Sequence, residues 1–459
     1  MAMNGQKGSN LQNGQVNGEG DHKIRYIPLP YSSSDSEASA LRLVLAIRPE
    51  WEDDARSNLV KFVRFTDGIT NTLLKAVNKK PGLSQEQIDK EAILLRAYGN
   101  GTEMIIDRQR ETQNHELLMK HGLAPELLAR FENGMMYRFI QGVVCHPEDL
   151  RKPEIYKAVA RRLAQWHAVM PCIPGPTGHG RTGRIRSTSK SQIPTVTYPD
   201  DIYQRCIDGA APGLPSPNVF TVMQKWIYAL PTETEEQIRR QLELQAEQTR
   251  IVSEFSERPC GFQGLVFAHC DLLSGNVIVL PNQKSQPAVN GEAVNGDNKA
   301  KPLATTEAPE VAFIDYEYAT PSPAAFDIAN HFAEWGGFDC DYSVLPTKAQ
   351  RRAFIAEYVH AYFGFLREKS GPEATKKVDE AKEVEKLCRE VNHFRGLPGF
   401  YWGIWALIQA TISEIDFDYA SYAETRLGEY WAWRDECDGK RAKRGEEMPL
   451  RETRWNTEE

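Results

Sequence analysis

The sequence predicts an α+β protein with two lobes, a smaller β-rich N-terminal lobe followed by a larger helix-rich C-terminal lobe. The chain has 459 residues, more than one hydrophobic core usually serves. Short apolar runs typical of strands gather in its first third, whereas residues 348–434 place apolar and aromatic side chains at steps of three and four. We therefore expect the lobes to comprise residues 23–145 and 146–437.

Composition indicates a globular protein and excludes several classes of partner. Hydrophobic residues make up 41% of the chain, which is enough to build packed cores. The net charge of −8 disfavours nucleic acid or an anionic membrane as main partner, because both need a basic surface. We find neither an apolar run long enough to span a bilayer nor the apolar block of a signal peptide, so we expect a cytoplasmic protein. The eight cysteines form no C-x-x-C pair and are expected to be reduced thiols.

Three runs in the N-terminal lobe have the composition of strands, and one stretch has the pattern of a helix. The runs are LVKFVRF (59–65), TLLKAVN (72–78) and AILLRAYG (92–99), and the helix is expected from about Arg110 to His121. Residues 1–22 are rich in Gly, Asn and Gln, which bury too little surface to offset the entropy of ordering. We expect this segment to be a disordered tail.

Three segments of biased composition interrupt or follow the predicted elements. Residues 281–310 separate the strand-like runs NVIVL and VAFIDYEYA and are interpreted as an overgrown hairpin loop, to which we assign no role. Residues 174–194 are basic and rich in Gly, Ser and Thr, a composition that is more often a solvated loop than a phosphate site. Residues 438–459 are highly charged and are expected to fray as a tail.

The strongest functional signal is HCDLLSGN, which runs from His269 to Asn276 between the apolar runs LVFA and VIVL. It matches the H-x-D-x-x-x-x-N loop of phosphoryl transfer, in which a carboxylate accepts the proton of the attacking hydroxyl and an amide oxygen holds magnesium. We predict Asp271 as the catalytic base and Asn276 as a magnesium ligand. His269 belongs to the same catalytic loop, and its imidazole is expected to brace the loop rather than to act as acid or base.

A second carboxylate follows the next strand-like run. FIDYE places Asp315 at the end of this run, where phosphoryl-transfer enzymes hold metal, and Asp315 is predicted as the second magnesium ligand. Glu317 and Asp327 bring further carboxylates, which either bind a second metal or accept backbone hydrogen bonds. For Asp327, which begins DIANHF, an N-cap of a helix is an equally good interpretation.

The N-terminal lobe is expected to cover the nucleotide. The turn TDGITN offers backbone N–H groups to phosphate oxygens, although with one glycine a plain hairpin turn is at least as common. Arg96 is predicted to neutralise phosphates and to pair with Glu111, although each alone is more often a solvated surface charge. The predicted nucleotide-binding turn residues are Asp67, Gly68, Ile69, Thr70 and Asn71.

An acceptor pocket is predicted from aromatic residues near the C-terminal end. Trp402 and Trp405 are three apart and therefore share a helix face, and Tyr422 follows in the same helical region. Glu334 comes soon after the predicted metal-binding strand. Aromatic faces and a carboxylate together suit a small ammonium, by cation–π attraction and charge. The alternative, that these aromatics only fill the helical core, stays open.

These stretches resemble the choline and ethanolamine kinase family, over most of residues 62–430. Tyr316, the ITN turn and the GLAP stretch are more similar to ethanolamine kinases than to choline kinases. The matching stretches are TDGITNTL, ILLRAYGNGTEMIIDRQRE, HGLAPELL, FENGMMYRFIQG, VFAHCDLLSGNVIVL, FIDYEYATPSPAAFDIANHFAEWGGF and FYWGIWALIQATISEIDFDYASYAETR.

The resemblance implies a protein-kinase-like bilobal fold, Mg²⁺ and ATP as the donor, and ethanolamine as the acceptor. The product would be phosphoethanolamine for the CDP-ethanolamine route to phosphatidylethanolamine, and a homodimer is possible by analogy. One departure is Cys270, where the family usually has Asn, which puts bracing of the loop in doubt. By position, the resemblance assigns the base to Asp271, magnesium to Asn276 and Asp315, the nucleotide side to Arg96 and Glu111, and the amine pocket to Glu334, Trp402, Trp405 and Tyr422.

Three rival interpretations remain at this point. A choline kinase, or an enzyme that takes both amines, fits the same aromatic pocket. A metal-dependent oxygenase is raised by His269, Asp271 and His331, which imitate a two-histidine, one-carboxylate iron site, but such a site belongs on a jelly roll and the following sequence is helical. A non-catalytic scaffold with the same fold is disfavoured because all expected catalytic positions are filled.

Overall fold

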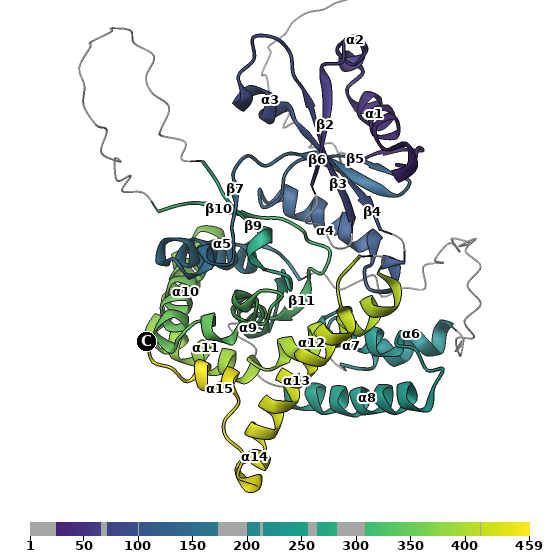
Figure 1. Cartoon of the computed structure of the whole chain (residues 1–459). Helices are drawn as coiled ribbons and strands as arrows, with labels where there is room; N and C mark the ends of the chain where they lie inside the picture. Colours follow the sequence, from purple (N-terminus) through teal and green to yellow (C-terminus); the bar gives the residue numbers. More distant parts are fainter. Residues whose placement is uncertain are drawn as a thin grey trace, which may run out of the picture.

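The computed structural model describes residues 24–65, 71–99, 101–172, 200–211, 214–255, 264–281, 308–413 and 415–459. A twisted sheet with a few helices forms one lobe, and helices around two small sheets form the other (Figure 1). The predicted α+β fold with a strand-rich N-terminal lobe and a helix-rich remainder is therefore confirmed. Within the described ranges, none of the helices combines the length and apolar character that crossing a bilayer requires.

The N-terminal lobe contains a six-stranded sheet with the order β1-β5-β6-β4-β3-β2. Neighbouring strands pair antiparallel, except that β1 runs parallel to β5. The three strand-like runs of the sequence are β2, β3 and β4, so those predictions are confirmed. The strands are β1 (Arg25–Ile27), β2 (Val60–Phe65), β3 (Asn71–Asn78), β4 (Ile93–Tyr98), β5 (Leu127–Phe131) and β6 (Gly134–Arg138).

Four helices complete this lobe. Helix α1 buries Leu43 and Val44 in one core with the sheet. Helix α4, predicted from about residue 110, begins at Arg108 because Asp107 caps it, accepting hydrogen bonds from two backbone N–H groups of its first turn at 3.1 Å. The helices are α1 (Ser36–Ile47), α2 (Glu52–Arg56), α3 (Gln85–Glu91) and α4 (Arg108–Lys120).

Two small sheets follow the large sheet along the chain. One has the order β10-β9-β7, and the other pairs β8 with β11. Strands β9 and β10 pair antiparallel, as expected for the ends of a long hairpin, but β10 ends at Phe313, so VAFIDYEYA is a strand only in its first three residues. The strands are β7 (Val143–Val144), β8 (Leu265–Ala268), β9 (Val277–Val279), β10 (Val311–Phe313) and β11 (Thr320–Pro323).

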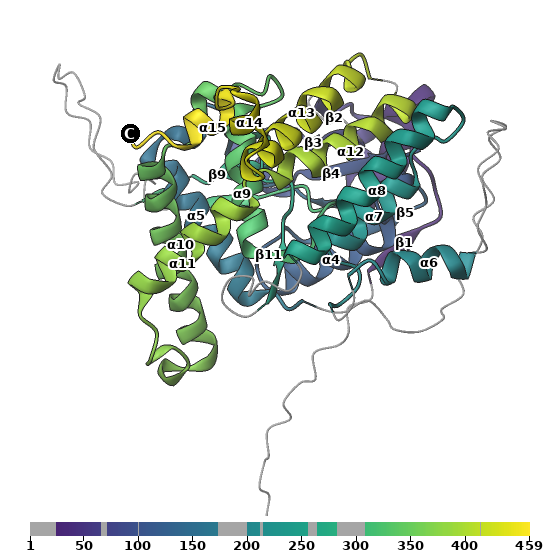
Figure 2. The same cartoon turned by 90° about the horizontal axis from the view of Figure 1, so that it is seen from below.

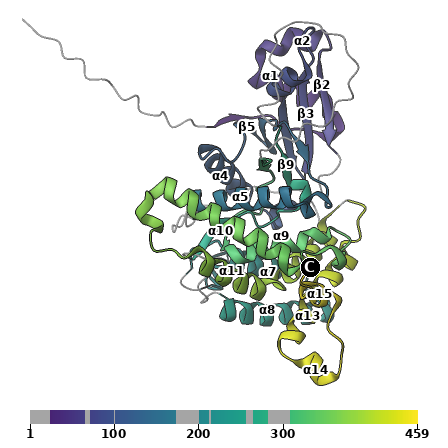
Figure 3. The same ribbon diagram turned by 90° about the vertical axis from the view of Figure 1, so that its left-hand side faces the viewer.

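The C-terminal lobe is a packed set of helices around one large core. Helix α10 lies along α5 (Figure 3), while α12 packs against α13 and α7 against α8 (Figure 2). The helical prediction for residues 348–434 is confirmed, and Pro398 stands in the first turn of α12, where its missing N–H costs nothing. The helices are α5 (Pro153–Val169), α6 (Asp200–Asp208), α7 (Val219–Tyr228), α8 (Glu235–Phe255), α9 (Ala324–Ala333), α10 (Lys348–Ser370), α11 (Glu380–Phe394), α12 (Leu397–Ile412), α13 (Tyr419–Cys437), α14 (Lys440–Arg444) and α15 (Leu450–Trp455).

The expectation that residues 438–459 fray is wrong. Trp455 is only 1% exposed, its backbone carbonyl accepts a hydrogen bond of 2.8 Å from Arg351, and the same guanidinium lies 3.9 Å from the centre of its ring. The backbone N–H of Lys348 donates to Thr457 at 2.9 Å. One large apolar side chain thus fixes a segment whose charge suggested a solvated tail.

Candidate active site

The predicted catalytic loop, residues 269–276, connects β8 to β9 and places two of the predicted side chains in contact. The amide Nδ2 of Asn276 donates to the backbone carbonyl of Asp271 at 2.8 Å and to its carboxylate at 3.1 Å. The backbone N–H of Ile314, which directly precedes Asp315, donates to the carbonyl of Asn276 at 3.1 Å. The structure therefore brings Asp271, Asn276 and Asp315 to one place, although they are far apart in the sequence.

Two residues of this site adopt a backbone conformation that most residues avoid. Cys270 has φ +54° and Asp315 has φ +65°, both in the left-handed region. Asp tolerates this region because its short polar side chain bonds locally, whereas Cys does not share that preference. Such residues persist only where their surroundings fix them, and they concentrate at functional sites.

Asp327 supplies the fixing contacts. Its carboxylate accepts backbone hydrogen bonds from His269 at 2.9 Å and from Cys270 at 2.7 Å. The N-cap interpretation is wrong: α9 begins after Pro323, so Asp327 lies a full turn inside the helix and is completely buried. The alternative that it accepts backbone hydrogen bonds is confirmed.

A buried chain of hydrogen bonds continues behind Asp327. Its carboxylate lies 2.9 Å from Nε2 of His167, whose Nδ1 lies 2.8 Å from the hydroxyl of Tyr358. Burial raises the pKa of Asp327, but the hydrogen bond and charge of His167, together with the bonds from the loop, bring it below its ordinary value. Asp327 is therefore an ionised acceptor that holds the catalytic loop in position.

His269 braces the loop, as its sequence context suggested. Its Nε2 lies 3.1 Å from the carbonyl of Ile314, and its Nδ1 accepts from the backbone N–H of Asp271 at 3.4 Å. Burial lowers the pKa of His269 to about 4, so the ring is neutral at physiological pH. A neutral ring with both nitrogens engaged is suited to bracing.

The oxygenase interpretation is contradicted. His331 uses Nδ1 for the carbonyl of Leu272 at 2.8 Å and Nε2 for the indole N–H of Trp335 at 3.3 Å. Both nitrogens of His269 are likewise occupied. Across the part of the chain that the structure describes, no three His, Cys, Asp or Glu side chains are placed to share a metal ion.

Asp271 is 9% exposed and stands in a field of negative charge. Burial, followed by the charges of Asp315, Glu334 and Glu317, raises its pKa well above the ordinary value. The carboxylates that repel one another here come from different elements of the C-terminal lobe. A site that gathers desolvated carboxylates and a carboxamide in this way suits a hard divalent cation.

Arg96 joins the two lobes. Its guanidinium pairs with Glu111 at 3.5 Å, as predicted, and also contacts Asp315 at 2.8 Å and Glu317 at 2.5 Å. Arg108 adds a second cation, 3.1 Å from the same oxygen of Glu317. Glu317 thus accepts hydrogen bonds from the guanidinium groups of two arginines. The sequence had suggested that it binds a metal or accepts backbone hydrogen bonds, and neither suggestion included these contacts.

The predicted nucleotide turn is described only at its end. Asp67, Gly68, Ile69 and Thr70 lie outside the described residues. Asn71 begins β3, and its amide nitrogen donates to Glu317 at 3.1 Å while its amide oxygen accepts from Arg108 at 3.2 Å. The turn therefore ends beside the Arg96 and Glu317 contacts.

The predicted aromatic pair lies on α12, with its rings 5.5 Å apart in an edge-to-face arrangement. The indole N–H of Trp405 donates to the hydroxyl of Tyr318 at 2.8 Å, and the ring of Tyr318 stands edge-on to Trp402 at 5.6 Å. The indole N–H of Trp402 donates to Asn330 at 2.8 Å, and Asn330 in turn donates to the carbonyl of Cys270 at 2.9 Å. The aromatic pair is thereby connected to the catalytic loop.

Glu334 and Tyr422 meet beside Arg426. The guanidinium of Arg426 lies 3.4 Å from the carboxylate of Glu334 and 5.8 Å from the ring centre of Tyr422. Burial raises the pKa of Glu334, although the positive charge of Arg426 opposes this. The field of Glu334 reaches Asp271, so the predicted acceptor side and the catalytic loop belong to one region.

Four residues of this region were not predicted from the sequence: His167, Tyr318, Asn330 and Arg108. Only two had a usable signal. Arg108 is three residues before Glu111 and Asn330 three after Asp327, so each pair shares a helix face. His167 and Tyr318 are brought to the site by tertiary packing alone.

The fold and this arrangement define a phosphotransferase of the protein-kinase-like class. An ethanolamine kinase of Plasmodium vivax has a similar fold, with a TM-score of 0.56 at 22% identity, covering 86% of this chain and 89% of that one. A choline kinase of Cryptosporidium parvum reaches a TM-score of 0.50 at 19% identity, covering 91% and 100%.

Sequence comparison gives the family. The model of the choline/ethanolamine kinase family matches residues 62–431, and the chain belongs to this family. Human ethanolamine kinase 1 is 32% identical over 406 residues, which cover 86% of this chain and 72% of the relative. A probable ethanolamine kinase of Nematostella vectensis is 31% identical over 400 residues, covering 86% and 93%. The resemblance seen in the sequence is confirmed.

Proposed function

We propose that this protein is an ATP-dependent ethanolamine kinase, which transfers the terminal phosphoryl group of ATP to the hydroxyl of ethanolamine. The observation that carries this proposal is the convergence of Asp271, Asn276 and Asp315 beside Glu334 and the aromatic pair on α12. Relatives named ethanolamine kinase support the choice of acceptor. The product, phosphoethanolamine, would serve phosphatidylethanolamine synthesis.

Asp271 is the proposed base. A base for a hydroxyl works best when its pKa approaches the working pH, and burial with neighbouring carboxylates moves the pKa of Asp271 in that direction. Its hydrogen bond from Asn276 keeps the carboxylate oriented. His269 takes no proton in this scheme, because its neutral ring holds Asp271 and Ile314 in place.

Asn276 and Asp315 are the proposed magnesium ligands. These two side chains fit magnesium because a carboxamide and a carboxylate are hard oxygen ligands. The neighbouring negative charges of Asp271 and Glu334 also favour a bound cation. When bound, magnesium neutralises charge on the transferring phosphate. Arg96 supplies a permanent cation on the nucleotide side, where it contacts Asp315.

Glu334, Trp402, Trp405 and Tyr422 are the proposed amine pocket, and Tyr318 joins them because it bonds to one indole and stacks edge-on with the other. A primary ammonium requires hydrogen-bond acceptors, which Glu334 provides. Choline is the second candidate acceptor, because aromatic faces also bind a trimethylated ammonium. An enzyme that takes both amines is compatible with the same residues.

The test is a phosphorylation assay with labelled ATP and Mg²⁺. Ethanolamine, monomethylethanolamine, dimethylethanolamine and choline are compared at equal concentration, and kcat/KM is determined for each. We expect the highest value for ethanolamine and a decline with each added methyl group. A maximum at choline would transfer the assignment to the second candidate, and no phosphorylation of any of the four would refute the proposal.

Two further expectations from the sequence, the boundary between the lobes and the location in the cell, are part of this proposal. The division at residues 145 and 146 is supported by the change from the large sheet to the helical lobe. The cytoplasmic location expected from the sequence stays a prediction.

A further inference from the structure

Glu334 is the first member of a buried series of alternating charges that crosses the C-terminal lobe. Arg426 on α13 lies 3.4 Å from Glu334 and 3.6 Å from Glu429, so one guanidinium pairs with a carboxylate on each side. Glu429 lies 3.9 Å from Arg451 on α15, and Arg451 lies 3.3 Å from Glu452. We call these five residues the ion-pair series.

All members of the ion-pair series are buried. Arg426 is 1% exposed, and the two carboxylates that flank it, Glu334 and Glu429, are 7% and 8% exposed. Arg451 and Glu452 are 4% and 1% exposed, and Glu452 is paired at its far side with Arg395 at 2.8 Å. A buried charge that loses its partner is costly, so each member constrains the next.

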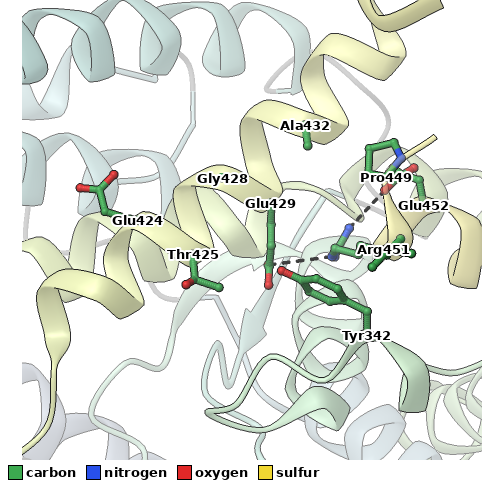
Figure 4. Close-up of a pocket in the computed structure, with 10 residues that line it drawn as sticks. Tyr342, Glu424, Thr425, Gly428, Glu429, Ala432, Pro449, Arg451 and Glu452 are labelled. Carbon is green, nitrogen blue, oxygen red and sulfur yellow. Dashed lines mark hydrogen bonds and ion pairs between the residues drawn. The ribbon is translucent and has the colours of Figure 1, made fainter. Parts of the chain in front are cut away.

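The far end of the series borders a cavity of about 250 Å³ beside α13 and α15. Figure 4 shows Glu429 and Arg451 among the residues that line this cavity, joined by their ion pair, with the ring of Tyr342 beside them. The cavity is thus lined by Glu429, which pairs with Arg426, and by Arg451, which pairs with Glu429. It is lined by α13 and α15, whereas Glu334 lies beyond Arg426, where its charge acts on Asp271 of the catalytic loop.

We infer that Arg426 is a positioning residue that holds the carboxylate of Glu334 toward the amine, and that Glu429 and Arg451 set how strongly Arg426 does so. This inference rests on the proposed function, because it assigns Glu334 to the ammonium. It also gives the C-terminal helix α15 a part in acceptor binding, through Arg451, although α15 itself lies outside the pocket.

The ionisation of Glu334 depends on a defined set of neighbours. Arg426, Glu429 and Tyr422 face it from α13, Asp271 faces it from the catalytic loop, and Cys340 lies 3.9 Å from Arg426 in the segment after Glu334. Burial raises the pKa of Glu334, Arg426 lowers it, and the negative charge of Glu429 raises it. Removing Arg426 and removing the charge of Glu429 must therefore move this pKa in opposite directions.

The experiment measures KM for ethanolamine as a function of pH. In Arg426→Gln, Glu334 stays protonated to a higher pH, so KM for ethanolamine is expected to rise by about tenfold or more at neutral pH. The pH at which binding weakens should move upward relative to the wild type. In Glu429→Gln the same pH should move downward, because a like charge has gone. Arg426→Lys should lie between Arg426→Gln and the wild type, and KM for ATP should stay within about twofold in all variants.

Arg434→Gln is the matched control. Arg434 is a buried arginine of the same helix, but it pairs with Glu247 and Glu254 instead of Glu334. Its loss tests damage to α13 without touching the ion-pair series, so its pH profile should coincide with that of the wild type. If Arg426→Gln does not fold, Arg426→Lys and Glu429→Gln carry the comparison.

The inference is overturned if the pH profiles of the Arg426 and Glu429 variants coincide with the wild type, if they move in the same direction, or if Arg434→Gln reproduces the effect. Failure of the proposed function has a different appearance. In that case the wild type itself does not phosphorylate ethanolamine, and no amine KM exists to compare.

Discussion

The guanidinium of Arg96 lies 2.8 Å from the carboxylate of Asp315, so a cation on strand β4 of the N-terminal lobe directly contacts a proposed metal ligand of the C-terminal lobe. The same guanidinium reaches Glu111 and Glu317. Three carboxylates around one flat, forked cation require the geometry of arginine, which lysine does not reproduce. Arg96 thus connects the two lobes at the proposed site of phosphoryl transfer, together with the contacts of Arg108 and Asn71 to Glu317.

The first prediction concerns this contact. Arg96→Lys keeps the charge but cannot reach all three carboxylates, so we expect KM for ATP to rise by about tenfold while KM for ethanolamine changes little. Steady-state kinetics with each substrate varied in turn measure both quantities. Arg138→Lys, on neighbouring β6, is the control, since Arg138 pairs only with carboxylates that are half or more exposed. An unchanged KM for ATP in Arg96→Lys would remove Arg96 from the nucleotide side.

The second prediction separates activity from stability at Asp271. Its raised pKa means that the folded protein holds this proton more tightly than the unfolded chain does. Stability is therefore lost as pH rises from the ordinary carboxyl pKa through the folded one. Asp271→Asn removes the buried charge, so turnover should be abolished while Tm rises by about 2 °C or more above neutral pH.

Thermal unfolding without nucleotide or magnesium, at several values between about pH 5 and pH 8, checks this sign. The advantage of Asp271→Asn over the wild type should grow with pH. A variant that retains turnover would contradict the assignment of the base, and a Tm difference that shrinks with rising pH would contradict the electrostatic argument.

The third prediction concerns Asp327, whose pKa lies below its ordinary value because His167 and the loop N–H groups bond to the ionised form. This stabilisation is present above the unfolded pKa and is lost as pH falls through the folded one. Asp327→Ala leaves two backbone N–H groups and His167 without their buried acceptor. We expect a loss of about 3–5 kcal/mol in the free energy of unfolding, and a fall in kcat of about 100-fold because the loop shifts.

Denaturant unfolding and kcat at saturating substrates measure these effects. Asp379→Ala, which removes an exposed N-cap carboxylate of α11, is the control for loss of a helix-associated aspartate and should leave kcat unchanged. A kcat close to that of the wild type in Asp327→Ala would show that the loop keeps its position without this residue.

Much of the fold and of the site could be predicted from the sequence, since the deciding signals are local. Strands β2, β3 and β4 follow from short runs of apolar and β-branched residues, and the HCDLLSGN loop follows from fixed spacing between two apolar runs. The position of Asp315 beside this loop could be predicted as well, because the two strand-like runs become close neighbours once residues 281–310 are set aside, and Asp315 ends the second run.

What the sequence did not reveal depends on contacts between distant segments. Asp327 begins the motif DIANHF, which is compatible with an N-cap, but the helix starts three residues earlier and the carboxylate turns to the catalytic loop. Glu317 forms ion pairs with two arginines of the other lobe. Trp455 fixes a charged segment that pattern alone describes as solvated. No periodicity within a segment encodes such partners.

The fourth prediction concerns Cys270, which occupies a left-handed conformation with its thiol 3.3 Å from the hydroxyl of Ser322. Asn accepts this conformation more readily than Cys, so Cys270→Asn should unfold with a free energy equal to the wild type or higher by up to about 1 kcal/mol. Cys270→Ala keeps the backbone strain and loses the thiol contact, and it should be the less stable variant. Burial raises the pKa of this thiol well above its usual value, so alkylating reagents should label the exposed Cys206 and Cys437 before Cys270.

Equilibrium unfolding and mass spectrometry after brief alkylation check both statements. A loss of kcat in Cys270→Asn would mean that the thiol itself serves the loop, and early labelling of Cys270 would mean that the loop opens far more readily than its burial indicates.

The fifth prediction uses the two functions of Trp402, whose ring faces Tyr318 and whose indole N–H donates to Asn330. Trp402→Phe keeps an aromatic face and removes the hydrogen bond that supports the carbonyl of Cys270 through Asn330, so kcat should fall more than KM for ethanolamine rises. Trp402→Leu removes both, and KM for ethanolamine should rise by about tenfold with loss of the cation–π contact. Trp405→Phe is the control, because its lost bond to Tyr318 does not reach the catalytic loop. KM for ATP should stay constant throughout, and a rise in that quantity would place the tryptophans on the nucleotide side instead of in the amine pocket.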